Sequence, residues 1–135
     1  MSPEFSVFHC SAMEEKLHSD YLHGRPFGGT SVLCKSSLAC TSSLVIANNP
    51  RCCVVKLSFR HCNDMVVVSV YMPCVTGSLE QDMEYENVVG CLQAIVDCNR
   101  GCNFVFGGDF NISKHHEKTS AHSIRTNFCY RNNIV

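Results

Sequence analysis

The sequence predicts an α/β protein, in which helices pack on the faces of a β-sheet. Three features in the middle of the chain predict this class. A β-hairpin is predicted over residues 53–71, a helix begins after Ser78, and a short apolar strand follows at 103–106. A helix between two strands returns the chain to the sheet, so these elements are expected to share one core.

The composition fits one domain or part of one, and residues 1–135 are treated as a single partial domain. The chain has 135 residues, of which 45% are hydrophobic, and a formal net charge of −1. This charge does not indicate a polyanion partner, although a local basic patch would suffice for nucleic acid. No stretch is apolar enough to span a membrane, and the start lacks the form of a signal peptide. We therefore expect an intracellular location, in the nucleus or cytoplasm, with no membrane partner and no assigned protein partner.

Cysteine is abundant, with eleven residues in the chain. Cys34, Cys53, Cys91 and Cys98 lie within apolar runs, which predicts small buried hydrophobic side chains in a reducing compartment. Structural zinc sites typically use Cys-x2-Cys pairs, and the sequence contains none. No metal ligand is therefore predicted.

The first half of the chain alternates short strands with turns. Short strands are predicted at residues 5–8, 30–35 and 44–47, with a loop or weak strand at 36–43. A turn-forming cluster, Gly24-Arg25-Pro26-Phe27-Gly28-Gly29, precedes the second strand. Residues 48–51 predict another turn.

The hairpin is the clearest unit. Residues 53–59 alternate apolar and polar side chains from Val55 onward, and a turn is predicted at 61–64. Residues 65–71 are β-branched and nearly all apolar, as expected for a central strand covered on both faces. Pro73 stops the sheet pairing.

A helix is predicted from Ser78 to a C-terminal cap at Gly101. Ser78 is a good N-cap and Gln81 follows three residues later, as in a capping box. One apolar stripe is formed by Leu79, Met83, Val88, Leu92, Ile95 and Val96. A second helix is predicted to begin within 123–132, with Ile124 and Phe128 on one face.

The segment Gly107-Gly108-Asp109-Phe110-Asn111 follows the strand at 103–106. The two glycines allow a backbone turn that side chains would obstruct. The Asp109 carboxylate can bind a metal or take a proton from water, and the Asn111 amide can donate to a phosphate oxygen. A simple tight turn uses the same residue types and is the favoured interpretation of this spacing alone.

Three segments in this order resemble a known family. They are Gly24-Arg25-Pro26-Phe27-Gly28-Gly29, Val70-Tyr71-Met72-Pro73 and Gly107-Gly108-Asp109-Phe110-Asn111. The chain resembles the endonuclease/exonuclease/phosphatase (DNase I-like) superfamily, and most of all the endonuclease domains of non-LTR (LINE-type) retrotransposons. The resemblance implies a partial four-layer α/β/β/α sandwich that lacks N-terminal and C-terminal elements. It also implies Mg²⁺-dependent hydrolysis of a DNA phosphodiester.

The resemblance assigns roles to four residues. Asp109 matches the aspartate that activates the attacking water, and Asn111 matches the asparagine that holds that water and the phosphate. Tyr71 matches a tyrosine whose hydroxyl contacts the phosphate, although alone it would be interpreted as a packing residue. Arg25 is a candidate contact to the DNA backbone, because a guanidinium suits phosphate. A solvated turn residue is an equal interpretation of Arg25 without the family.

Departures from the family pattern predict an incomplete catalytic set. The Gln-Glu pair that supplies the family's metal-binding glutamate does not precede Gly24, and its terminal Asp-His pair would lie past Val135. We therefore expect a middle portion of the domain that is inactive on its own. Two alternatives stay open: another superfamily hydrolase, acting on inositol phosphates or phospholipids, and a non-catalytic Cys-rich interaction module. The Gly-Arg-Pro-Phe-Gly-Gly segment favours the retrotransposon branch over the first alternative.

Overall fold

The computed structural model describes residues 4–11, 29–45, 47, 49–74, 78–111, 125, 127–129 and 132. These residues form six strands and one long helix. In chain order they are β1 (Phe5–Cys10), β2 (Thr30–Lys35), β3 (Cys40–Val45), β4 (Cys52–Phe59), β5 (Met65–Tyr71), α1 (Leu79–Cys98) and β6 (Asn103–Asp109).

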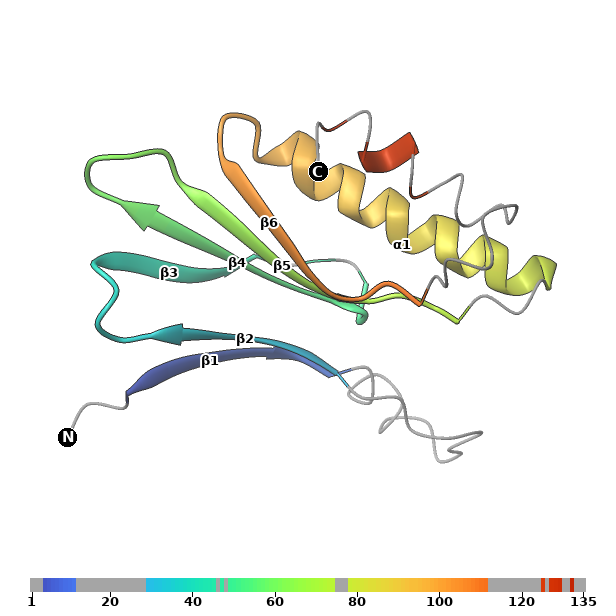
Figure 1. Ribbon diagram of the computed structural model, residues 1–135, viewed down its shortest axis with the longest axis horizontal. Coiled ribbons are helices and arrows are strands. Elements are labelled where there is room, and N and C mark those ends of the chain that lie inside the picture. Colours follow the sequence, from blue (N-terminus) through green and yellow to red (C-terminus); the bar gives the residue numbers. More distant parts are fainter. Residues whose placement is uncertain are drawn as a thin grey trace.

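The strands form two sheets, which lie face to face (Figure 1). Strands β1 and β2 form an antiparallel pair. The larger sheet has the order β3-β4-β5-β6, with antiparallel pairs except for the parallel pair β5-β6. Helix α1 covers the face of the larger sheet that points away from β1 and β2. The prediction that residues 65–71 form a central strand is confirmed, since β5 lies between β4 and β6.

The predicted α/β class with a four-layer α/β/β/α sandwich is wrong. The described chain is mostly strand, arranged as two small sheets and one helix. A second helical layer was implied by the family resemblance and by no hydrophobic pattern in the residues. Val7 and Leu33 are opposite each other on β1 and β2, and each is 60% exposed. Among the described residues, no helix covers that outer face.

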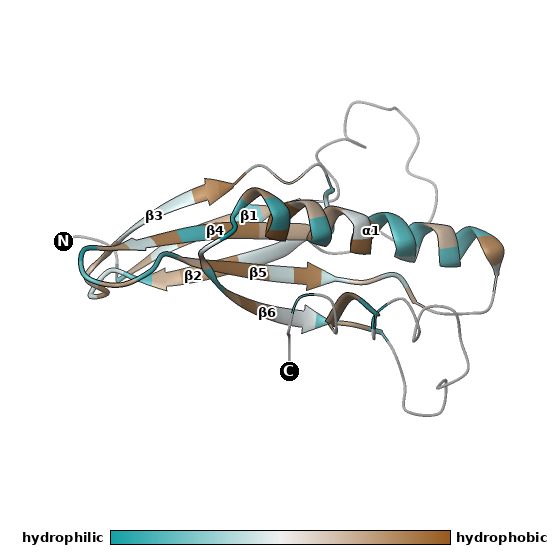
Figure 2. Cartoon of the chain, turned by 90° about the horizontal axis from the view of Figure 1, so that it is seen from above, coloured by the Kyte–Doolittle hydropathy of each residue, from teal (hydrophilic) through white to brown (hydrophobic). Residues whose placement is uncertain are grey.

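One hydrophobic core lies between α1 and the larger sheet. Val66, Val68 and Val70 of β5 contribute to it, and in Figure 2 this strand is mostly coloured as hydrophobic. The residues that α1 buries are Tyr85, Val88, Leu92 and Ile95. The predicted stripe is therefore right in its second half and wrong in its first, where Leu79 and Met83 are 78% and 57% exposed. The start of α1 extends beyond the strands, so it has no sheet to pack against (Figures 1 and 2).

A second hydrophobic core lies between the two sheets. Its buried members are Val32 and Cys34 of β2 and Cys53, Val55 and Leu57 of β4. Burial raises the pKa of the Cys34 and Cys53 thiols, which therefore stay protonated and apolar.

The cysteine predictions are confirmed in part. None of the eleven cysteines forms a disulfide bond. Cys34 and Cys53 are buried as predicted, and Cys91 is half-buried. Cys98, the last residue of α1, is exposed and is not among the residues that the helix buries.

The element boundaries were predicted well where capping or β-branching marks them. The Gln81 N–H donates to Ser78 Oγ at 3.4 Å, which confirms the predicted N-cap. The helix ends earlier than predicted, with Asn99 as its C-cap, whereas Gly101 has a φ of 91° in the turn beyond. Strand β3 begins at Cys40, before the predicted 44–47, because its small polar residues pair with β4. Phe128 is buried against the α1 core, whereas Ile124 lies outside the described residues.

Candidate functional site

Two of the predicted site residues meet at the ends of neighbouring strands. Because β5 and β6 run parallel, their carboxyl ends share one edge of the sheet. Tyr71 and Asp109 are register partners there. The Met72 N–H donates to the Asp109 carbonyl oxygen at 2.8 Å, which ties the two chain segments together just past the strands.

Gly108 allows β6 to approach β5 at this edge. Its φ is 137°, and a Cβ built there would lie 1.9 Å from the Val70 carbonyl oxygen. Gly107 is different, since a Cβ added to it would meet nothing within 4 Å. The two glycines thus continue the strand rather than forming the predicted turn, and β6 extends to Asp109.

Asn111 shapes the loop after β6. Its backbone has a φ of 47°, the left-handed region that Asn tolerates better than most residues. The Asn111 N–H donates to Asp109 Oδ1 at 2.9 Å, and Asn111 Nδ2 donates to the Met72 carbonyl oxygen at 2.7 Å. The first bond orients the Asp109 carboxylate, and the second joins the loops that follow β5 and β6.

A hollow of about 490 Å³ opens beside these strand ends. Its lining residues are 29–31, 69–71, 108 and 109, so the start of β2 faces the ends of β5 and β6 across it. Asp109 is the one carboxylate among these lining residues, and it is exposed. Thr30 contributes a buried hydroxyl that has no hydrogen-bond partner in the part of the chain that the structure describes.

Tyr71 is half-buried, and its ring lies under the guanidinium of Arg51, a residue that was not predicted to belong to the site. The guanidinium carbon of Arg51 is 5.5 Å from the centroid of the Tyr71 ring. The predicted hairpin contained the signal for this contact. Antiparallel pairing of β4 with β5 places Cys52 opposite Val70, so Arg51, which precedes β4, lies beside Tyr71, which ends β5.

The remaining predicted site residues are not assembled here. Arg25 lies outside the described residues. Asn111 does not line the hollow, although it orients Asp109, which does. The described residues thus bring Tyr71 and Asp109 together directly and add Asn111 as a neighbour.

The described donors do not fit the Mg²⁺ ion that the family implies. Mg²⁺ takes six oxygen ligands in octahedral geometry and is usually held by one or two carboxylates and phosphate oxygens. Asp109 is a single carboxylate, and one of its oxygens already accepts the Asn111 N–H. Among the described residues, no three His, Cys, Asp or Glu side chains form a group that could hold a metal ion.

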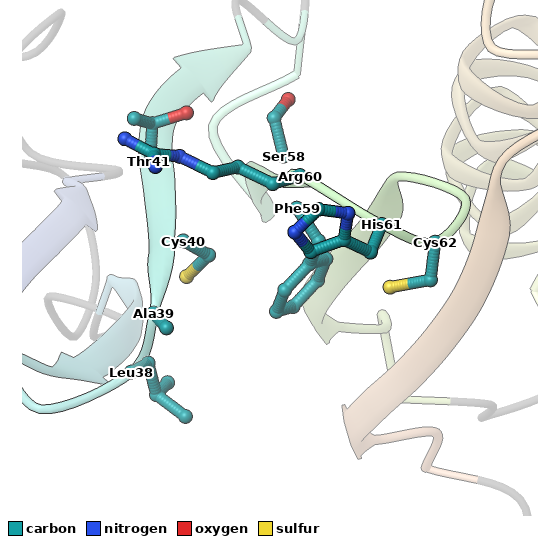
Figure 3. Close-up of a pocket in the computed structure, with 9 residues that line it drawn as sticks. All are labelled: Leu38, Ala39, Cys40, Thr41, Ser58, Phe59, Arg60, His61 and Cys62. Atoms are coloured by element: carbon teal, nitrogen blue, oxygen red, sulfur yellow. The ribbon is translucent and has the colours of Figure 1, made fainter.

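A second hollow, of about 760 Å³, lies at the opposite end of the larger sheet, beside the start of β3 and the turn that joins β4 to β5. Residues 38–41 and 58–62 line it, and none of these carries a carboxylate. Figure 3 shows the Arg60 side chain extending toward Thr41 and the His61 ring beside Phe59. The thiols of Cys40 and Cys62 lie on opposite sides of this hollow.

No family model, no curated protein and no solved structure matches this chain. Within the described residues, no helix is both long enough and apolar enough to cross a membrane. The functional assignment therefore rests on the chemistry of the strand ends and on the sequence motifs.

Proposed function

We propose that this chain carries part of a phosphodiester-binding site for DNA, similar to that of retrotransposon-type endonucleases, and that it does not cleave DNA on its own. One observation carries the proposal. Asp109 and Tyr71 are paired in register at one sheet edge, and both line the same 490 Å³ hollow.

The two side chains offer complementary chemistry toward a phosphodiester. A tyrosine hydroxyl is a hydrogen-bond donor for a phosphate oxygen. No described residue hydrogen-bonds the Tyr71 hydroxyl, whereas the Tyr71 backbone is bonded on both sides. A carboxylate held by one backbone N–H, as Asp109 is by Asn111, keeps a second oxygen that can take a proton from an attacking water.

The same residues explain why we expect no cleavage by this chain. Hydrolysis of a phosphodiester needs positive charge against the phosphate and the leaving oxygen. The described lining of the hollow contains no Lys, Arg or His, and it adds the negative charge of Asp109. Catalytic groups that act as a unit give little rate when part of the set is missing.

A binding measurement tests the phosphate contact. Fluorescence anisotropy of a labelled 20-base-pair duplex is expected to show affinity for the wild-type chain that Tyr71→Phe weakens by about tenfold. One hydrogen bond to a charged group contributes about 1.5 kcal/mol, which corresponds to this factor. Tyr85→Phe is the matched control, because the Tyr85 hydroxyl is buried away from the hollow. Equal affinity of wild type and Tyr71→Phe would refute the proposed contact.

A plasmid-nicking assay with Mg²⁺ tests the second half of the proposal. Neither the wild type nor Asp109→Ala is expected to convert supercoiled plasmid to the open circle. Nicking by the wild type that Asp109→Ala abolishes would show a complete catalytic site, and the expectation of an inactive chain would then be wrong.

A further inference from the structure

Arg51 lies between the candidate site and helix α1, and it is held from both sides. It precedes β4, in a turn where the Arg51 N–H donates to Asn49 Oδ1 at 2.9 Å. Its side chain is only 11% exposed. A guanidinium that is largely removed from water needs defined partners. Here one partner is a residue of α1 and the other is Tyr71.

The partner on α1 is Glu84. Arg51 Nε and Nη2 donate to the same carboxylate oxygen, Glu84 Oε1, at 3.0 and 2.7 Å. Two donors of one planar group fix the orientation of that plane. Exposed ion pairs contribute little to stability, and the Glu84 side chain is 47% exposed. We therefore expect the Glu84 contact to act mainly by fixing the orientation of the Arg51 guanidinium, and only slightly by its energy.

Arg51 contacts Tyr71 at three places. The Tyr71 N–H donates to the Arg51 carbonyl oxygen at 3.0 Å, and Arg51 Nη1 lies 3.4 Å from the Tyr71 carbonyl oxygen. The guanidinium also lies over the Tyr71 ring, at 5.5 Å from its centroid. The backbone and the ring face of Tyr71 are thus restrained, and its hydroxyl has no bond to the described residues.

We propose that Arg51, held by Glu84, is a positioning residue that sets the Tyr71 phenol toward the hollow. The inference rests on the proposed function, since it gives the Tyr71 hydroxyl a phosphate to contact. Lysine cannot replace arginine here, because an ammonium lacks the planar fork that contacts Glu84 and the ring together. Helix α1 thereby influences a site whose lining residues it does not supply.

Fluorine NMR of the chain labelled with 3-fluorotyrosine tests the positioning without any ligand. The chain has four tyrosines, and loss of one signal in Tyr71→Phe assigns Tyr71. Arg51→Lys and Glu84→Gln are both expected to shift or broaden the Tyr71 signal and to leave the Tyr85 signal in place. Arg100→Lys is the control, since Arg100 forms an exposed ion pair with Asp97 at the opposite end of α1 from Glu84. An unmoved Tyr71 signal in both Arg51→Lys and Glu84→Gln would overturn the inference.

A double-mutant cycle with the labelled DNA duplex separates positioning from a direct DNA contact. Arg51→Lys is expected to weaken binding several-fold, and the double variant Arg51→Lys/Tyr71→Phe is expected to bind like Tyr71→Phe alone. Losses that multiply in the double variant would overturn the inference, because Arg51 would then act independently of the phenol. If Tyr71→Phe binds as well as the wild type, the proposed function fails, and the fluorine spectra alone decide the positioning.

Discussion

The hollows at the two ends of the larger sheet differ in chemistry as well as in size. At one end, the hollow beside Tyr71 and Asp109 measures about 490 Å³. At the other end, the hollow beside Phe59 and Cys62 is larger, at about 760 Å³, and its lining carries no carboxylate. Size therefore does not identify the candidate site.

The difference follows from the direction of the strands. At the smaller hollow, β5 and β6 are parallel, so two separate loops leave the sheet at one edge and their polar residues meet. At the larger hollow, one turn joins β4 to β5 and another connection leads from β2 into β3, and neither contributes a carboxylate to the lining. The parallel ends of β5 and β6 bring Tyr71 and Asp109 together, whereas the lining of the larger hollow carries no such pair.

The largest expected effect is at the site end, at Gly108. Gly108→Ala would place a Cβ 1.9 Å from the Val70 carbonyl oxygen in a backbone with φ of 137°. Backbone strain and overpacking each cost about 1–3 kcal/mol, so we expect a loss of about 3 kcal/mol or more in unfolding free energy. Gly107→Ala, with open space around its Cβ, is the control. Urea unfolding curves that coincide for Gly108→Ala and the wild type would contradict the close approach of β6 to β5.

A smaller effect concerns the core under the site end, where Tyr85 packs with Met72. Burial raises the pKa of Tyr85 to about 12. An acid whose pKa is raised by folding stabilises the fold below its unfolded pKa of about 10, and this contribution is lost as the pH rises toward 12. We expect the wild type to lose up to about 2 kcal/mol more than Tyr85→Phe between pH 10 and pH 12.

Chemical denaturation at a series of pH values measures this difference. Both proteins contain the same cysteines, so thiol titration cancels in the comparison. At neutral pH, Tyr85→Phe is expected to be as stable as the wild type or about 1 kcal/mol more stable, because the buried hydroxyl has no partner among the described residues. Parallel stability curves up to pH 12 would show that Tyr85 is solvated in the folded chain.

The smallest expected effect is at the hairpin end. Arg60 is an exposed cation that lines the larger hollow, far along the strands from Asp109. Arg60→Gln is expected to change the affinity for the labelled DNA duplex by less than about twofold, because one exposed charge is screened by salt. A tenfold loss of affinity would instead show that the DNA binds at the hairpin end.

Local patterns predicted most of the strands and the long helix, whereas the site residues were taken from the family resemblance. The β-branched run at 65–71, the Ser78 cap and the alternation at 53–59 each specify their element through short-range chemistry. Tyr71 and Asp109 were identified from motifs at strand ends, and their juxtaposition follows from two parallel neighbouring strands. Arg51 was missed because its partners, Glu84 and Tyr71, are distant in the sequence and become neighbours only when α1 packs on the sheet.

The sequence by itself determined the strands, the helix and its cap, because hydrophobic period and capping chemistry act over a few residues. Only the tertiary structure decided the layers. Leu79 and Met83 in the first turns of α1 are apolar yet exposed, since no strand lies beneath them, and no second helix covers β1 and β2 in the described chain. The tertiary structure also decided that Gly108 belongs to β6 rather than to a turn, because its backbone lies close against Val70 of β5.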